Sequence, residues 1–333
     1  MTLADQLRRR WPKQWPLQMV PRVAWTQQRP LYAEAQPAII NAALDRALHR
    51  PTGNWFAFAA SDEVRGDRPF GTRVAGVELV AWRGADSELI VGPAGCPHLG
   101  ADLATGTVSD GTLFCPWHGL AMTAAGCALR WRRLPGHDDG VLAWVRLDSV
   151  GGETPLDRPV VPSRPEGATL AAVTRVVGAC EPSDIIANRL DPWHGAWFHP
   201  HSFALLDVLS TPTEDDDRFV VSVTFRVGGL GVPTIAEFTC PDARTIVMRI
   251  VEGEGVGSVV ETHATPLGPG PKGGPNVAVL EAVVAQSPRP GFRAARALAP
   301  VVKPLVRHAG HRLWRDDLEY AERRYQLRQR GSG

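Results

Sequence analysis

The 333-residue sequence has few cysteines, few lysines, little net charge and no long apolar run. Its apolar stretches are interrupted within about ten residues, well short of the ~20 that a membrane-spanning helix needs. The first ten residues carry three arginines and lack the apolar core of a signal peptide. Five cysteines are too few for a disulfide scaffold, and a net charge of +1 excludes a strongly basic nucleic-acid-binding protein. We therefore expect a soluble, cytoplasmic protein that binds no nucleic acid.

Glycine and proline are abundant instead, with 33 and 29 copies, which favours strands and turns over a helical bundle. The patterning predicts four segments: a lead with one helix at 1–50, a strand-rich domain at 51–150, a Gly/Pro-rich connector at 151–167, and a domain at 168–333. In the last segment a helix around 182–190 is followed by strands and then by helices at 292–309 and 312–328. We expect an α+β protein.

Two short motifs in the strand-rich domain combine cysteine and histidine. Cys96-Pro-His98 is followed by Cys115-Pro-Trp-His118. Two loops of this kind can place both thiolates on one iron and both imidazoles on the other, which is the ligand set of a Rieske [2Fe–2S] centre. Tetrahedral zinc is the alternative. The tight-turn flanks and the lack of a finger-like helix after the second pair favour the cluster.

A second constellation follows the connector, between Asn188 and His201, where histidine, aspartate and tryptophan are dense. His194 and His199 could converge if the helix around 182–190 ends near Gly195. Two imidazoles and one carboxylate on one face of an iron ion leave positions open for dioxygen and substrate. Taken alone, such a histidine pair is more often structural.

Both motifs together resemble those of the Rieske non-haem iron oxygenases, in the same order along the chain. The second matches that family's Asn/Asp-x-x-Asp-x-x-His-x4-His signature. The resemblance implies an all-β Rieske domain joined to a helix-grip-like catalytic domain, whose antiparallel sheet is covered by helices. It implies iron held by His194, His199 and a distant aspartate, for which Asp317 is favoured and Asp316 is the alternative.

The resemblance also assigns other roles. Asp191 would join a cluster histidine, His118, of one subunit to His194 of its neighbour, which implies a homotrimer. Asn188 would lie near the iron without binding it, and His201 is a surface histidine, a substitute ligand or a support for one. No Gly-x-Gly-x-x-Gly motif follows a strand, so electrons would come from a separate NAD(P)H-dependent reductase, with or without a ferredoxin.

The implied function is that of a terminal oxygenase component using Fe(II) and dioxygen. It would hydroxylate or oxidatively demethylate an apolar substrate of aromatic, steroid or isoprenoid type. A desaturase or oxidative cyclase with the same centres and a Rieske electron-transfer protein are the alternatives. We expect the Arg- and Trp-rich lead at 8–15 to pack along the protein body; contact with a membrane surface is the competing interpretation.

Overall fold

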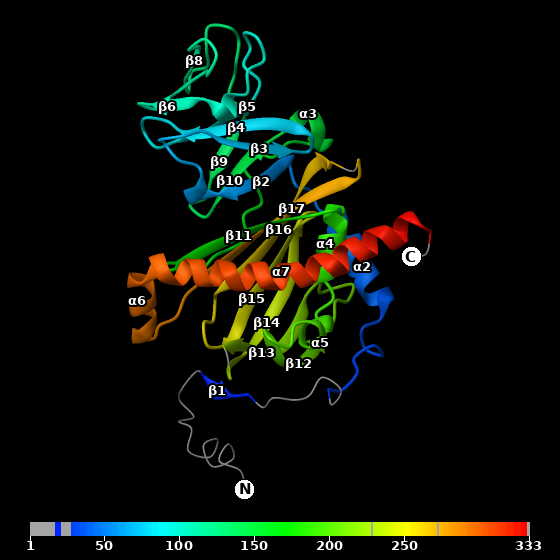
Figure 1. Cartoon of the computed structure of the whole chain (residues 1–333). Coiled ribbons are helices and arrows are strands. Elements are labelled where there is room, and N and C mark those ends of the chain that lie inside the picture. Colours follow the sequence, from blue (N-terminus) through cyan, green and yellow to red (C-terminus); the bar gives the residue numbers. More distant parts are fainter. Residues whose placement is uncertain (1–16, 21–27, 228, 272, 332–333) are drawn as a thin grey trace.

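The computed structural model describes residues 17–20, 28–227, 229–271 and 273–331. A small strand-rich half stands at one end of a larger half, which is built on one antiparallel sheet and crossed by a long helix (Figure 1). The expected α+β architecture is confirmed. The prediction made for residues 8–15 lies outside the described residues.

The smaller half contains three three-stranded antiparallel sheets, with the orders β2-β10-β9, β3-β4-β5 and β6-β7-β8. Its strands are β2 (Trp55–Ala60), β3 (Phe70–Val74), β4 (Val77–Arg83), β5 (Leu89–Pro93), β6 (Thr107–Ser109), β7 (Thr112–Phe114), β8 (Ala121–Met122), β9 (Gly136–Asp138) and β10 (Leu142–Arg146). Its short helices are η2 (Ser61–Glu63), η3 (Leu103–Thr105) and α3 (Asp148–Gly151).

The larger half is organised around one eight-stranded sheet of order β11-β17-β16-β15-β14-β13-β12, with β1 paired to β14. Every pairing is antiparallel. From β12 to β17 each strand pairs with the next one along the chain, whereas β11 and β1 pair with strands that are distant in sequence. The strands are β1 (Gln18–Met19), β11 (Leu170–Gly178), β12 (Phe203–Ser210), β13 (Phe219–Val227), β14 (Leu230–Asp242), β15 (Thr245–Gly253), β16 (Val259–Pro269) and β17 (Pro275–Ala285).

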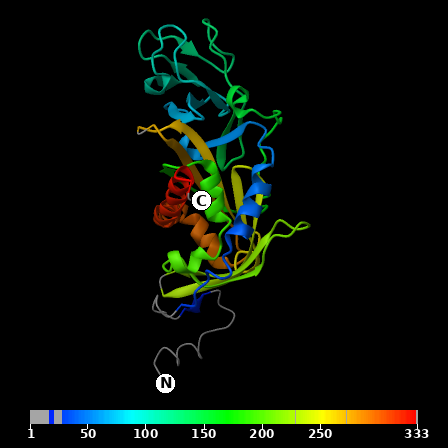
Figure 2. The same ribbon diagram turned by 90° about the vertical axis from the view of Figure 1, so that its right-hand side faces the viewer.

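The helices gather on one side of this sheet, as the two views in Figures 1 and 2 show. None of the helices among the described residues is long and apolar enough to cross a membrane. They are α2 (Pro37–Leu48), α4 (Pro182–Arg189), α5 (His194–Phe198), α6 (Pro290–Ala297) and α7 (Ala299–Gln329).

Helix α7 differs from the prediction, which placed a break at residues 310–311. The break lies at Leu298 instead, and Gly310 is in the middle of α7. A Cβ at Gly310 would lie 2.6 Å from Thr174 Oγ1, so this glycine lets α7 approach β11 closely rather than end the helix. Gly310, Trp314, Asp317 and Ala321 are buried at a helical spacing, which turns one face of α7 toward the sheet.

The two halves share an apolar core. Trp55 and Trp144, on β2 and β10, pack against Ala278 and Leu280 of β17. Thr265 Oγ1 of β16 also donates a hydrogen bond of 2.6 Å to the backbone carbonyl of Ala57. This packing fixes the small half against the edge of the sheet.

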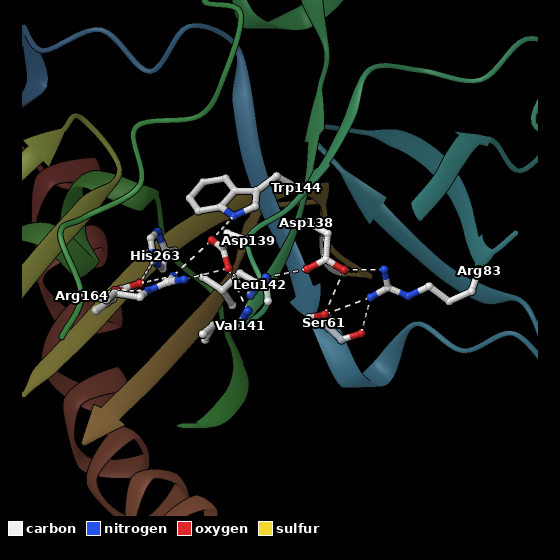
Figure 3. A network of polar contacts seen from close by, with 11 residues as sticks. Ser61, Arg83, Asp138, Asp139, Val141, Leu142, Trp144, Arg164 and His263 are labelled. Carbon is white, nitrogen blue, oxygen red and sulfur yellow. Dashed lines mark hydrogen bonds and ion pairs between the residues drawn. The ribbon is translucent and has the colours of Figure 1, made fainter. Parts of the chain in front are cut away.

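A buried ionic network reinforces the same junction (Figure 3). Arg164, in the connector, donates hydrogen bonds of 2.6 and 2.7 Å to the two carboxylate oxygens of Glu261 on β16. Its guanidinium also lies 2.8 Å from the carboxylate of Asp139, which follows β9 and accepts from Trp144 Nε1. His263 Nε2 completes the network 3.3 Å from Glu261.

We expect Arg164→Met to lower the free energy of unfolding by about 3–5 kcal/mol, because it leaves two buried carboxylates without their cation. Chemical denaturation monitored by tryptophan fluorescence measures this. Arg218→Met is the matched control: Arg218 is exposed and pairs with Asp216 and Glu237 on the surface, so a much smaller decrease is expected. Equal effects of the two substitutions would contradict the assignment.

The network also predicts acid sensitivity. Burial by itself would raise the pKa values of Asp139 and Glu261, but the bonds from Arg164 outweigh it and hold both below their ordinary values of 3.8 and 4.5. Their stabilising contribution is therefore present above these values and lost as the pH falls below about 4.5. Unfolding free energies measured from about pH 6 to 3 should fall more steeply for the wild type than for Arg164→Met.

Candidate metal centres and substrate cavity

The first two candidate ligand pairs lie on two loops of similar construction. Cys96 and His98 follow β5, and Cys115 and His118 follow β7. In each loop the cysteine carbonyl accepts a hydrogen bond from a glycine four residues on, Gly100 at 2.9 Å and Gly119 at 3.0 Å. Both glycines have positive φ, +79° and +69°, which side-chain-bearing residues rarely adopt.

The loops bring the four side chains to one end of the small half. The two cysteines are buried, each 4% exposed. The two imidazoles are exposed, with ring centroids 4.8 Å apart. Buried sulfurs and solvent-facing histidines suit a cluster whose thiolate-bound iron lies inside and whose imidazole-bound iron faces outward.

Backbone amides support thiolate chemistry in the second loop. Burial by itself would raise the pKa of Cys115, but the amides of Trp117 and His118 outweigh it and lower that pKa. The other cysteines differ: burial raises the pKa of Cys240 to about 12, and Cys180 is fully buried. These two are packing residues.

The second constellation forms where α4, α5 and α7 meet. Helix α4 ends at Arg189, earlier than the bend near Gly195 that the sequence suggested, and the separate one-turn helix α5 begins at His194. His199 terminates α5, so the two imidazoles flank a single turn. Asp317 reaches them from the buried face of α7.

Three side-chain nitrogen atoms converge on one carboxylate oxygen of Asp317. Asp317 Oδ1 lies 3.1 Å from His194 Nε2, 2.9 Å from His199 Nε2 and 3.0 Å from Asn188 Nδ2. Burial would raise the pKa of Asp317, but the bonds from the two histidines outweigh it and hold that pKa far below its usual range. The other carboxylate oxygen is buried without a hydrogen-bonding partner among the described residues.

The tautomer of His194 shows that a cation fits here. Its Nδ1 contacts the backbone carbonyl of Asp191, which can only accept, so Nδ1 carries the proton. In neutral His194, Nε2 is then a bare acceptor facing another acceptor, Asp317 Oδ1. Such a contact requires an extra proton or a metal ion between the two atoms. His194, His199 and Asp317 are close enough for one ion to bind all three.

Asp316 is placed differently from Asp317. Its Oδ2 lies 3.4 Å from His199 Nδ1 and 3.8 Å from His201 Nε2. It therefore stands at the opposite edge of the His199 ring from Asp317. A carboxylate in this position can orient a ligating imidazole, and Asp316 also forms a second group with His199 and His201 whose ligand atoms are close enough for one ion.

Asp191 lies on the side of His194 away from Asp317. It is 7% exposed, and its Oδ2 is 3.9 Å from His194 Nδ1 and accepts a hydrogen bond of 3.3 Å from Tyr320. Its Oδ1 is buried without a partner among the described residues. Sequence reasoning did not select Tyr320, although it lies one helical turn after Asp317 and so shares its face of α7.

One cavity adjoins the three candidate iron ligands, and a second, larger one shares part of its lining. The smaller, about 40 Å³, touches His194, His199 and Asp317. The larger, about 470 Å³, lies between the sheet and α6–α7 and is mostly apolar. Four residues line both cavities, so the larger one leads toward the ligands: Arg189, Phe203, Phe225 and Met248. Sequence reasoning did not identify this cavity, because its walls come from strands and helices far apart in the chain.

Comparison with protein families gives two matches along the chain. Residues 54–139 match the Rieske [2Fe-2S] domain, and residues 150–332 match a family described as a domain of unknown function, DUF5914. The second match covers more than half of the chain. The boundary between the two falls close to α3.

Curated relatives share parts of the sequence. Aminopyrrolnitrin oxygenase of Pseudomonas fluorescens is 35% identical over 95 residues, which is 28% of this chain and 25% of that protein. Cholesterol 7-desaturase of Bombyx mori is 38% identical over 89 residues, 26% of this chain and 19% of that protein. The vanillate O-demethylase oxygenase subunit of Pseudomonas sp. (strain ATCC 19151) is 28% identical over 173 residues, which is 46% of this chain and 51% of that protein. The chain thus spans between a fifth and about half of the lengths of these relatives.

Solved structures share the fold over nearly the whole chain. The terminal oxygenase of carbazole 1,9a-dioxygenase from Novosphingobium sp. KA1 superposes with a TM-score of 0.57 at 15% identity, covering 91% of this chain and 90% of that one. Dicamba monooxygenase bound to dicamba gives 0.56 at 16% identity, covering 84% and 89%.

The Rieske match agrees with the geometry of the two Cys/His loops, and His194, His199 and Asp317 are close enough together to hold one metal ion. The chain belongs to the DUF5914 family, carries a Rieske [2Fe-2S] domain, and shares the fold of the two oxygenases named above over nearly its whole length.

Proposed function

We propose that this chain is the terminal oxygenase component of a Rieske system that hydroxylates or oxidatively demethylates an apolar substrate. The contact that carries the proposal is the convergence of His194 Nε2 and His199 Nε2 on Asp317 Oδ1. When bound there, iron(II) with open coordination positions supplies dioxygen activation, and the Rieske cluster supplies electrons. In this proposal these three side chains hold the iron, and the cluster is held by Cys96, His98, Cys115 and His118.

The larger cavity is the proposed substrate site. Its volume of about 470 Å³ falls in the range of small-molecule pockets and suits an aromatic, steroid or isoprenoid body. Phe203, Phe225 and Met248 stand between it and the candidate iron ligands, where they exclude water from the reacting carbon.

Arg189 gives this cavity a polar end. Its guanidinium lies 5.9 Å from the centroid of the Trp314 ring and makes no hydrogen bond with the described residues. Glu281, the nearby acid, accepts from Trp314 Nε1 at 2.9 Å instead. We assign Arg189 to an oxygen of the substrate, so that an otherwise apolar molecule is held in one orientation.

The position of the cluster favours electron transfer from the cluster of one subunit to the iron site of another. The β6–β8 end of the small half and helix α5 lie at opposite ends of one chain (Figure 1). The exposed His118 of one subunit would therefore meet Asp191 of the next, in a head-to-tail homotrimer. Asp191 would connect the two centres, and Asn188 would orient Asp317 through its 3.0 Å hydrogen bond.

Electrons would come from outside the chain. The sequence has no glycine-rich nucleotide motif after a strand, so we propose a separate NAD(P)H-dependent reductase, with or without a ferredoxin. The vanillate O-demethylase relative is likewise named as an oxygenase subunit. All five cysteines are free, in keeping with the cytoplasmic location that we propose.

Product analysis under ¹⁸O₂ tests the proposal. The holoenzyme, with a surrogate reductase and NADH, is given a panel of aromatic, steroid and isoprenoid compounds. A product carrying ¹⁸O supports hydroxylation, and formaldehyde release from a methoxy substrate supports demethylation. An unlabelled, dehydrogenated product would instead identify the reaction as desaturation, which is the activity in the name of the Bombyx mori relative. A cluster that is reduced and reoxidised without any substrate turnover would favour an electron carrier.

A further inference from the structure

We propose that the outer face of α6 and of the first turns of α7 docks onto an anionic lipid surface. Its centre is an apolar patch of Leu298, Val301 and Leu305, which are 59%, 61% and 64% exposed. Their spacing places Val301 and Leu305 on one side of α7, next to the break at Leu298. Exposed small and cyclic side chains extend the patch: Ala294, Ala297, Pro300 and Pro304.

The segment that carries the patch is basic, and three of its cations pair with acids of other elements: Arg289 with Glu254, and Lys303 and Arg307 with Asp62. Residues 288–315 contain seven arginines and lysines and no aspartate or glutamate. Arg293 and Arg296 on α6 are exposed and make no ion pair with the described residues, and Arg312 is exposed further along α7. An apolar centre flanked by unpaired cations matches a bilayer surface, where alkyl side chains enter the acyl boundary and cations contact phosphate headgroups.

A neighbouring side of the same helices faces the larger cavity. Phe292 of α6 and Val306, Ala309 and Leu313 of α7 line its wall. The proposed lipid-facing surface and the apolar cavity are therefore formed by adjacent faces of α7. A substrate that partitions into the bilayer would have a short path into the protein at this place.

The location leaves the proposed subunit contacts free. Helix α6 lies at the end of α7 away from α5, and it belongs to the larger half, well below the β6–β8 end of the small half (Figure 1). A bilayer on this face would therefore not compete with the contact that we propose between His118 and Asp191. A second copy of the chain would place Arg293 and Arg296 against the same cations if it packed symmetrically, which disfavours self-association here.

Vesicle co-sedimentation tests the surface without turnover. The holoenzyme is mixed with vesicles of phosphatidylcholine alone or of phosphatidylcholine with phosphatidylglycerol, and Leu298→Glu/Val301→Glu/Leu305→Glu is compared with wild type. We expect sedimentation with the anionic vesicles that weakens with salt and falls at least about fivefold in the triple variant. The matched control, Leu129→Glu/Val177→Glu/Val256→Glu, changes three half-exposed apolar residues elsewhere and should bind like wild type.

Three results would overturn the proposal: no sedimentation of the wild type with anionic vesicles, equal loss in both triple variants, or a larger oligomer in ultracentrifugation that only the patch substitutions dissociate. The last would make the patch a subunit interface. None of these results bears on the oxygenase proposal, because the assay contains no reductase and no substrate. Turnover of a detergent-dispersed substrate should be the same in the patch variant and the wild type.

Discussion

Replacing His199 with alanine is expected to lower the iron content from about three to about two atoms per chain, while about two acid-labile sulfides remain. His199 is 1% exposed, so solvent cannot supply a substitute ligand without rearrangement of α5. Turnover should fall by more than about 100-fold, beyond the effect of losing a group that only supports a ligand. Colorimetric iron and sulfide assays and the visible spectrum of the cluster measure the outcome.

Neighbouring residues provide matched controls. His201→Ala should keep the third iron, because His201 contacts Asp316 and not Asp317. Asp317→Asn should lose it, whereas Asp316→Asn should keep it with weaker affinity, by about tenfold. If Asp316→Asn lost the iron and Asp317→Asn kept it, the ligand assignment would be reversed. Two irons in wild type after incubation with ferrous salt would remove the mononuclear site altogether.

Asp191→Asn is expected to leave both metals in place and still slow electron transfer between them by about 10- to 100-fold. The substitution keeps the size of the side chain and removes its charge. Because Asp191 is buried beside His194 with one oxygen unpartnered, that charge is the feature we assign to the contact with His118 of the partner subunit.

Stopped-flow reoxidation of the reduced cluster, with dioxygen and substrate present, measures this rate directly. Tyr320→Phe serves as the control, since it removes the 3.3 Å hydrogen bond to Asp191 and leaves the carboxylate charge. It should change the rate far less. Normal reoxidation in Asp191→Asn would mean that the carboxylate only terminates the turn before Pro192.

The sequence was most informative where chemistry is local. Cys96 and His98 are two residues apart, as are the ends of a tight turn, so their spacing already implied a shared ligand loop. His194 and His199 likewise flank a single helical turn, so their spacing also implied a shared site. The carboxylate partner, 118 residues beyond His199, could be expected only from the family resemblance, because no local pattern distinguishes Asp317 from Asp316.

Long-range packing explains what the sequence did not reveal. Strand β14 was not predicted because Pro233 and Pro241 interrupt its pattern. In the structure Pro233 pairs with Thr224 of β13 and lies just beyond the last β14 residue that pairs with β15. Pro241 lies in a bulge of β14, where its pairing with β15 is interrupted. Leu205 in β12 has φ +48°, at another irregularity. The helix break predicted at 310–311 was wrong because the close contact of Gly310 with Thr174 cannot be inferred from either segment alone.

The packing of Trp55 and Trp144 on β17 restricts how electrons can travel. The small half cannot swing toward α5 of its own chain without exposing that apolar core and separating Arg164 from Glu261. In the proposed assembly each working centre is therefore a composite of two chains. Two inactive variants, one unable to hold the cluster and the other unable to hold the iron, can then complement each other when their subunits are mixed. Genetic dominance follows the same logic: a defective chain impairs the intact neighbours with which it assembles.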